Sequence, residues 1–342
     1  MKIQPAFRRL LAALFFTLLL TFFLHSIRSS VSAAPDFPTR TDVNSAQSVM
    51  IEIPEGASGS EIADVLFTQG VIKSRLSYFR IAVGDARSAQ VSPGAHTLTL
   101  RISAAQALDQ LLDPKRIPNL IKIFEGAWRS EIEASLRTYG FTAREISTAF
   151  SALQLPKGFK SAEGLLFPAQ YSFPKGTSAT KAVQAMVDRF RNEESGKDLL
   201  NSRGKYSPTE LLIMASIVQA EGDSKDFTKI AAVIQNRLRI SMPLQLDSTV
   251  HYIKKVRGQI FLSTDSTLIN SPFNTYKHYG LPPSPIGNPG AQAIQAVLNP
   301  AGGDWLYFIT VAPGDTRFTS SSDEFLQWKL LYEKNRRAGA FK

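Results

Sequence analysis

A long apolar helix that ends in a carboxylate constrains this chain more than any other feature of its sequence. Residues 207–210, Ser-Pro-Thr-Glu, have the form of a capping box with proline at the first helical position, so a helix should begin there. Residues 211–218 are almost all apolar, which predicts a helix in the core rather than on the surface. Glu221 closes this helix, and Gly222 stands where a C-terminal cap is expected.

Glu221 occupies a position that favours the protonated carboxyl group. The C-terminal end of a helix carries partial negative charge, and apolar neighbours also disfavour an ionised side chain. A carboxyl group that stays protonated near neutral pH can act as a general acid. The segment alone equally allows a solvated glutamate in the last turn. The motifs that follow distinguish this interpretation from a general acid.

Five short motifs follow one another in order along the second half of the chain. They are Ala-Ser-Ile-Val-x-x-Glu at 215–221, Asn-Arg-Leu at 236–238, Met-Pro-Leu-Gln-x-Asp-x-Thr-Val at 242–250, Asn-Thr-Tyr at 274–276 and Gly-Leu-Pro-Pro-x-Pro-Ile-x-Asn-Pro-Gly at 280–290. Each motif alone is a weak signal, whereas five in this order are a strong one. On these motifs the chain resembles the MltG-like (YceG-like) family of endolytic murein transglycosylases, from about residue 49 to 328.

The resemblance implies a lytic transglycosylase that cuts the MurNAc-GlcNAc bond within peptidoglycan strands. In such enzymes one glutamate protonates the leaving sugar and then draws a proton from the C6 hydroxyl, which leaves a 1,6-anhydroMurNAc end. The resemblance assigns this role to Glu221. Two alternatives stay open, a non-catalytic peptidoglycan-binding or scaffold protein of the envelope and a hydrolysing muramidase with Asp247 as its second carboxylate.

Other polar residues of the motifs are candidates for contacts with the substrate. Gln245 and Asn274 suit hydroxyl and acetamido groups because amides both donate and accept, and Tyr276 offers a flat face to a sugar ring. The alternative for all three is that they are loop residues whose polar groups bond within the protein. Asp247 either lines the cleft or caps a following helix. Asn236 and Arg237 are candidates for orienting Glu221 from an adjacent helix, or they make ordinary structural contacts.

The chain departs from the family pattern in two places. Ser248 stands where the family usually has proline, which leaves Asp247 in place. Ala169 and Gln170 stand where an upstream motif, 163–171, usually has aspartate and threonine, so these two positions receive no role.

The N-terminus carries a candidate membrane segment. Basic residues precede an apolar run at 10–24, a pattern that predicts an N-terminus inside and the rest of the chain outside. The run is shorter than the roughly 20 residues of a typical span, and residues 31–33 resemble a signal-peptidase site. We expect a retained single-pass anchor in the cell membrane with an extracytoplasmic catalytic region, as the resemblance implies; a cleaved signal peptide is the alternative.

A short pattern recurs along the chain. Residues 53–62 are echoed by 123–132 and more faintly by 173–179, and each copy reads as a strand, a glycine turn and a helix started by serine or threonine. Near the C-terminus, 305–311 reads as a buried strand that pairs with 316–318, and 324–337 as an amphipathic helix.

We therefore expect a mixed α+β protein. The expected order is a cytoplasmic stub and anchor at 1–33, a linker at 34–48, a LysM-like subdomain at 49–112, an intermediate α+β region at 113–205 and a catalytic region at 206–342. The LysM-like part, with glycan binding as its possible role, comes from the family resemblance.

Composition limits the other function classes. The chain of 342 residues has 39 Lys and Arg against 29 Asp and Glu, a net charge of +10, which suits an anionic lipid, an acidic polymer or a nucleic acid. No nucleic-acid-binding motif accompanies this charge, so nucleic acid is not an expected partner. The absence of cysteine excludes disulfides and thiol catalysis, and four scattered histidines favour neither a metal nor another cofactor. The expected partners are glycan strands, the membrane and, from the resemblance alone, membrane-embedded peptidoglycan synthases.

Overall fold

The computed structural model describes residues 34–42, 46–54, 56–118, 120–257 and 264–341, together with Thr17 and Thr21. These residues form two compact units. The first contains the described chain up to Pro118 and the short segment Ser172–Lys175, and the second contains the rest. The predicted domain boundaries at residues 112 and 205 stay predictions. Mixed α+β architecture is confirmed in both units.

The predicted membrane segment, 1–33, lies outside the described residues apart from the two threonines. Among the residues that the structure describes, no helix combines the length and the hydropathy needed to cross a bilayer.

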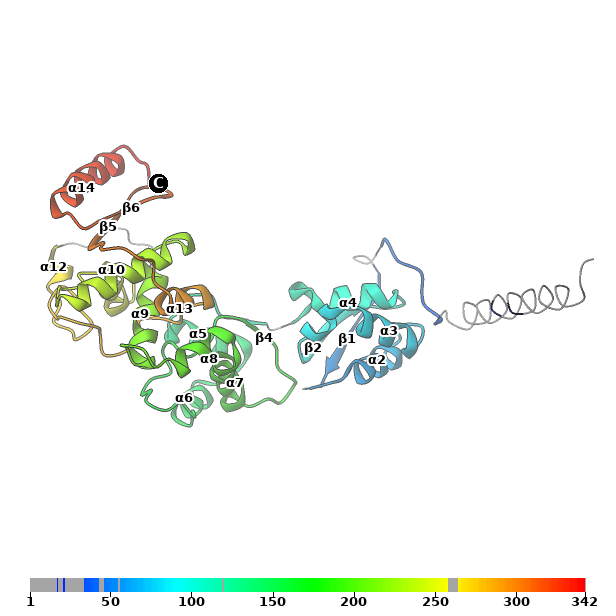
Figure 1. Cartoon of the computed structure of the whole chain (residues 1–342). Coiled ribbons are helices and arrows are strands. Elements are labelled where there is room, and N and C mark those ends of the chain that lie inside the picture. The colour runs from blue at the N-terminus through cyan, green and yellow to red at the C-terminus, as the bar shows by residue number, and fades with distance from the viewer. Residues whose placement is uncertain are drawn as a thin grey trace, which may run out of the picture. The chain divides into compact units, whose positions relative to one another are not determined.

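The first unit is a two-stranded antiparallel sheet with helices packed on one face (Figure 1). In chain order it contains β1 (Ser48–Ile53), α2 (Gly59–Thr68), α3 (Arg75–Gly84), the 3-10 helix Ala86–Gln90, β2 (Gly94–Thr99), α4 (Ala104–Leu112) and the 3-10 helix Pro114–Arg116. Alternation along β1 turns Ile51 and Ile53 toward the helices and leaves Met50 on the other face. The LysM-like identity of this unit stays a prediction.

The recurring pattern is confirmed in its glycine turns and in the helices that follow them. Gly56, Gly126 and Gly176 all have a positive φ, between 73° and 87°, which a glycine adopts without steric cost. The helix after the first turn starts with a capping box in which Ser58 and Glu61 bond each other's backbone N–H. The second copy differs, because its helix α5 (Arg129–Tyr139) starts after Trp128, whose side chain makes no cap bond. No strand lies within 173–179, so the predicted strand of the third copy is wrong.

The second unit is mainly helical. In chain order it contains β3 (Ile121–Lys122), α5 (Arg129–Tyr139), α6 (Ala143–Ser151), β4 (Gln170–Tyr171), α7 (Ala179–Asn192), α8 (Glu194–Asn201), α9 (Pro208–Glu221), the 3-10 helix Ser224–Asp226, α10 (Phe227–Arg239), α11 (Asp247–Lys254), α12 (Thr264–Thr267), α13 (Ala291–Leu298), β5 (Tyr307–Ala312), β6 (Asp315–Thr319) and α14 (Ser322–Arg337). Helices α10 and α13 pack against α9 (Figure 1).

Helix α9 is the central helix of this unit, as its sequence predicts. Ser207 and Glu210 form the capping box, and every residue of 211–218 is buried. Because this helix is enclosed on all sides, it gives the carboxyl group at its C-terminal end a fixed position.

Gly222 differs from the expected cap. Its backbone is extended, with φ −169° and ψ −175°, rather than left-handed. A Cβ at this position would lie 2.6 Å from Cδ1 of Ile230 on α10, so the close approach of that helix favours glycine here.

The C-terminal segment is a hairpin followed by a helix. Strands β5 and β6 pair antiparallel, with Phe308 opposite Phe318, which confirms the predicted pairing. Helix α14 packs against β5, and Tyr307 stacks on Phe325 at a centroid distance of 5.1 Å (Figure 1). None of the residues of α14 is fully buried, so this helix covers the hairpin without entering the core.

Candidate active site

Glu221 ends α9 next to the first turn of α11. Its Oε1 accepts a hydrogen bond from the backbone N–H of Ser248 at 3.3 Å. The side chain keeps partial access to solvent. A helix end thus supplies the carboxyl group, and the N-terminus of a second helix supplies its donor.

Burial and neighbouring polar and charged groups set the pKa of Glu221. The pKa of Glu221 is raised to about 7, chiefly by burial and also by the negative charge of Asp247. The hydroxyl and N–H groups of Ser248 and the positive charge of Arg237 lower the pKa. Since burial dominates, the carboxyl group exists in both protonation states near neutral pH, as the sequence suggested.

Asp247 and Tyr276 form a close pair beside Glu221. The Tyr276 hydroxyl donates a short hydrogen bond to Oδ1 of Asp247. Burial and this bond raise the pKa of Tyr276, so the phenol keeps its proton at any physiological pH. Asp247 is the first residue of α11 and Leu246 is its N-cap, so Asp247 does not cap the helix as one of the two predictions had it.

Two buried threonines fix the segment that carries Asp247. Thr275 Oγ1 accepts a hydrogen bond from the N–H of Leu246 at 2.9 Å and lies 3.0 Å from Oγ1 of Thr249. The N–H of Gln245 also bonds the carbonyl of Thr275, at 3.1 Å. Gln245 has a φ of +48°, and its side chain is exposed to solvent.

Asn274 is fully buried, and its amide group is bonded within its own loop. Nδ2 donates to the carbonyls of Thr267 and Ile269 at 2.9 and 2.8 Å, and Oδ1 accepts the N–H of Tyr276 at 3.0 Å. Asn274 therefore shapes the loop that presents Tyr276.

Arg237 is a buried cation that binds backbone carbonyls. Its Nη1 donates to the carbonyl of Leu244 at 2.6 Å, and its Nε donates to the carbonyl of Leu306 at 2.6 Å. Its effect on Glu221 is electrostatic. Arg237 thus joins α10 to the segment before Asp247 and to the start of β5.

Asn236, the neighbouring candidate, has a similar structural role. Its Nδ2 donates to the carbonyls of Gly303 and Trp305 at 3.0 and 3.1 Å. These bonds hold the loop before β5 against α10. Asn236 also lines a pocket whose wall does not include Glu221.

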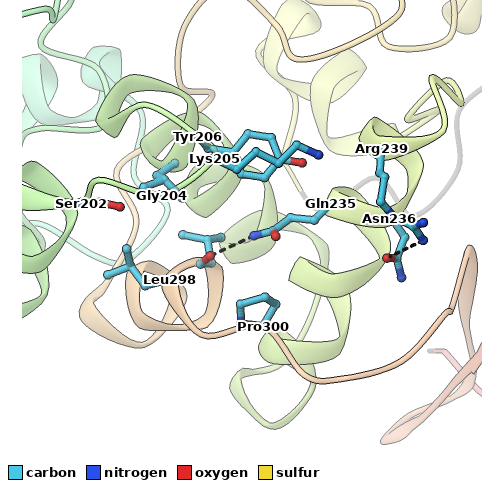
Figure 2. Close-up of a pocket in the computed structure, with 11 residues that line it drawn as sticks. Ser202, Gly204, Lys205, Tyr206, Gln235, Asn236, Arg239, Leu298 and Pro300 are labelled. Atoms are coloured by element: carbon cyan, nitrogen blue, oxygen red, sulfur yellow. Dashed lines mark hydrogen bonds between the residues drawn. The ribbon is translucent and has the colours of Figure 1, made fainter.

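The pocket lined by Asn236 lies between α10, α13 and the segment before α9 (Figure 2). It has a volume of about 320 Å³. In Figure 2 the side chains of Lys205 and Tyr206 extend over Gln235, and Arg239 approaches from α10. Gln235 donates to the carbonyl of Val297 at 2.9 Å, which fixes the floor of this pocket.

A smaller cavity of about 230 Å³ lies next to the residues that hold Glu221. Its wall includes Ala220, which precedes Glu221 in the chain, and Ser248, whose N–H donates to the Glu221 carboxyl group. The remaining lining residues are Glu125, Gly126, Trp128, Ser216, Gln219, His251, Val256, Arg257 and Ile286.

His251 lines this cavity and has an unused polar atom. Among the described residues its buried Nε2 has no hydrogen-bond partner. Burial lowers the pKa of His251 while Asp247 opposes this effect, so the imidazole is neutral near pH 7. A neutral imidazole nitrogen in a cavity can accept or donate one hydrogen bond to a ligand.

Arg257 connects the Trp128 loop, residues 123–128, to the site. It donates to the carbonyl of Gly126 at 2.7 Å, forms an ion pair with Glu131 at 2.6 Å and lies 4.0 Å above the ring of Trp128. Sequence reasoning did not include this loop in the site. The repeat of 53–62 at 123–132 marked the loop, but it gave no sign of the position beside α9.

Asn288 holds that loop in place. Its side chain is fully buried and bonds four groups: Nδ2 donates to the Ala127 carbonyl and to Oε1 of Glu163, and Oδ1 accepts the N–H groups of Gly164 and Leu166. The bond lengths lie between 2.8 and 3.1 Å. Asn288, in the 280–290 motif, thereby joins two upstream segments to the wall of the site.

Potential metal ligands do not gather anywhere in the described parts of the chain: no group of three or more His, Asp or Glu side chains could hold an ion there.

Comparison with known proteins places this arrangement in a family. The model of the YceG-like family matches residues 51–329. An endolytic murein transglycosylase of Bacillus subtilis is 31% identical over 311 residues, which cover 84% of this chain and 86% of that protein. One from Streptococcus pneumoniae D39 is 28% identical over 83% of this chain, which spans 58% of the pneumococcal protein.

A solved structure agrees with these relatives. The crystal structure of a YceG-like protein from Listeria monocytogenes is similar, with a TM-score of 0.54 and 27% identity. The match covers 82% of this chain and 98% of that one. With five ordered motifs, a family match across most of its length and this structural likeness, the chain belongs to the YceG-like family.

Proposed function

We propose that this chain is an endolytic murein transglycosylase, the activity for which its relatives from Bacillus subtilis and Streptococcus pneumoniae are named. The observation that carries the proposal is the Glu221 carboxyl group, held by burial at a pKa of about 7 beside a cavity. An acid with that pKa can both give and take a proton at neutral pH.

Glu221 acts in both halves of the reaction. Its proton passes to the glycosidic oxygen as the bond from that oxygen to C1 of MurNAc breaks, and the leaving GlcNAc gains a hydroxyl group. The resulting carboxylate then takes the proton of the C6 hydroxyl as O6 forms a bond to C1. The products are a 1,6-anhydroMurNAc end and a regenerated acid, and no water is consumed.

Asp247 supports this cycle through its charge. A negative group near Glu221 disfavours loss of its proton before cleavage, and it also favours positive charge at C1 in an oxocarbenium-like transition state. The bond from Tyr276 fixes the position of the Asp247 carboxylate. In the alternative muramidase, Asp247 would activate water or attack C1 itself.

The surrounding groups divide into binding and positioning residues. Gln245, with its exposed amide, and Tyr276 are proposed to contact the glycan, whereas Asn274, Asn236 and Arg237 position the segments around it. The cavity next to Ser248 is smaller than the roughly 300–1,000 Å³ of typical drug-sized ligand pockets, which suits one sugar substituent rather than a strand.

The location of the protein follows from its N-terminal sequence. We propose that the apolar run at 10–24 is a single-pass membrane anchor and that both structural units are extracytoplasmic. Peptidoglycan synthases embedded in the same membrane are the proposed neighbours, since cleavage near the membrane would limit the length of nascent strands.

Product chemistry tests this function. The full chain in detergent micelles is incubated with uncrosslinked glycan strands, and new ends are identified by mass spectrometry. Ends that lack one water are expected. Ordinary reducing ends would contradict the transglycosylase and favour the muramidase, and binding without cleavage would favour a non-catalytic protein.

A further inference from the structure

Helix α3 exposes apolar side chains on the face that points away from the core. Leu76, Phe79 and Val83 are 48%, 44% and 74% exposed. At about 100° per residue these three positions fall within a wedge of about 60° on one side of the helix. The opposite face is already used, because Tyr78 is fully buried in the core of the first unit. A helix on the surface of a soluble domain normally presents polar groups outward, so the α3 stripe needs a partner.

Two arginines border this stripe. Arg75 and Arg80 fall on opposite sides of the Leu76, Phe79 and Val83 wedge in the helical projection. The Arg75 guanidinium also pairs with Asp64 on α2, so a lipid phosphate would compete with that exposed carboxylate. An apolar stripe between cationic side chains is the pattern of helices that lie in the interface of an anionic bilayer.

The chain N-terminal to the unit is held at the start of this same helix. Ser74, the N-cap residue of α3, donates from its hydroxyl to the carbonyl of Pro35 at 2.7 Å. Asp36 accepts the N–H of Ala104 at 3.1 Å, so the segment is fixed at a second point. Only residues 25–34 separate Pro35 from the end of the apolar run at 24, a reach of at most about 40 Å.

We propose that the α3 stripe, Leu76, Phe79 and Val83, docks on the surface of an anionic lipid bilayer. The inference rests on the proposed membrane anchor, because that anchor would bring the start of α3 close to the bilayer. Burial of the three side chains among the acyl chains, with Arg75 and Arg80 at the phosphates, satisfies the face that the fold leaves uncovered.

The absence of cysteine allows a site-specific test on the full chain. Phe79→Cys carries an environment-sensitive fluorophore on the stripe, and Met50→Cys is the matched control. Met50 is 63% exposed and apolar, but it lies on β1, on the sheet face away from the helices. Both labelled proteins are reconstituted into liposomes of phosphatidylcholine and phosphatidylglycerol that contain a nitroxide quencher near the headgroups.

Docking predicts a blue-shifted emission and at least several-fold stronger quenching at position 79 than at 50. Replacing phosphatidylglycerol with phosphatidylcholine should weaken the quenching at 79. Equal quenching at the two positions, or stronger quenching at 50, would overturn the proposal and assign the stripe to a protein or glycan partner. Circular dichroism of both variants verifies that they fold.

An alkaline carbonate wash separates the two proposals. If the chain stays with the liposomes while the label at 79 is unquenched, the anchor holds and the docking of α3 is overturned. If the chain is washed off but the label at 79 was quenched beforehand, the docking stands and the anchor fails.

Discussion

The backbone N–H of Ser248 donates a hydrogen bond to the carboxyl group of Glu221, which places the first turn of α11 against the last turn of α9. The two helix ends have opposite effects on the acid. The C-terminal end of α9 disfavours its ionised form, and the N-terminal end of α11 favours it. Asp247, in the same turn of α11, adds a negative charge that again favours the proton. The start of α11 therefore tunes the group that we propose for catalysis.

Glu221→Gln should stabilise the fold at alkaline pH. The pKa of the Glu221 carboxyl group is 4.5 in the unfolded chain and about 7 in the folded one, so the folded state keeps the proton to higher pH. Stability of the wild type should fall relative to the variant as pH rises from 4.5 to above 7, by at most about 3 kcal/mol. Thermal unfolding of both proteins at pH 4.5 and pH 8 measures this, and an unchanged difference between the two pH values would contradict a raised pKa.

Asp247→Asn should move the alkaline limb of the pH–rate profile to lower pH. Removal of the negative charge removes one cause of the raised pKa of Glu221, so the acid loses its proton earlier. Tyr276→Phe is the matched control, because it removes the hydrogen bond to Asp247 but leaves the charge. Initial cleavage rates from pH 5 to pH 9 distinguish them; an equal shift in both variants would mean that the charge is not the cause.

Arg237→Met should move the alkaline limb of the pH–rate profile to higher pH. Its cation lowers the pKa of Glu221, so its loss should extend activity to higher pH. The variant also leaves buried carbonyls without donors, at a cost of about 2–4 kcal/mol in the free energy of unfolding. Urea unfolding and pH profiles are compared with Arg239→Met, which replaces an exposed neighbour. Equal unfolding midpoints in the two variants would contradict the assigned role.

Asn288→Ala should destabilise the second unit by about 3 kcal/mol or more, because four hydrogen bonds of a fully buried amide are lost together. Asn299→Ala is the control, since Asn299 is exposed and its side chain bonds only to Gln295. Denaturant unfolding provides the comparison. A loss below 1 kcal/mol for Asn288→Ala would show that the Trp128 loop does not depend on this residue.

Local chemistry made several elements predictable from the sequence. The capping box at Ser207 and the apolar run behind it specify α9 within a few neighbouring residues, and the short turn between β5 and β6 specifies that hairpin. The position of Glu221 at a helix end followed directly, and so did the direction of its pKa shift.

Contacts between distant segments were beyond such reasoning. The limited space beside Gly222 comes from Ile230, and the partners of Arg237 include a carbonyl at Leu306. The Trp128 loop is held at the site by bonds to Asn288 and Arg257, which lie far along the chain. None of these contacts leaves a periodic or local pattern in the sequence.

The central claim is that Glu221 alone supplies and recovers the proton. The most direct measurement compares cleavage of glycan strands by the wild-type full chain, Glu221→Gln and Glu210→Gln. Glu210 is the matched control because it lies on the same helix and glutamine can keep its capping role. Our account predicts that Glu221→Gln loses at least about 100-fold in rate while Glu210→Gln stays close to wild type. Cleavage by a folded Glu221→Gln variant at the wild-type rate would contradict it.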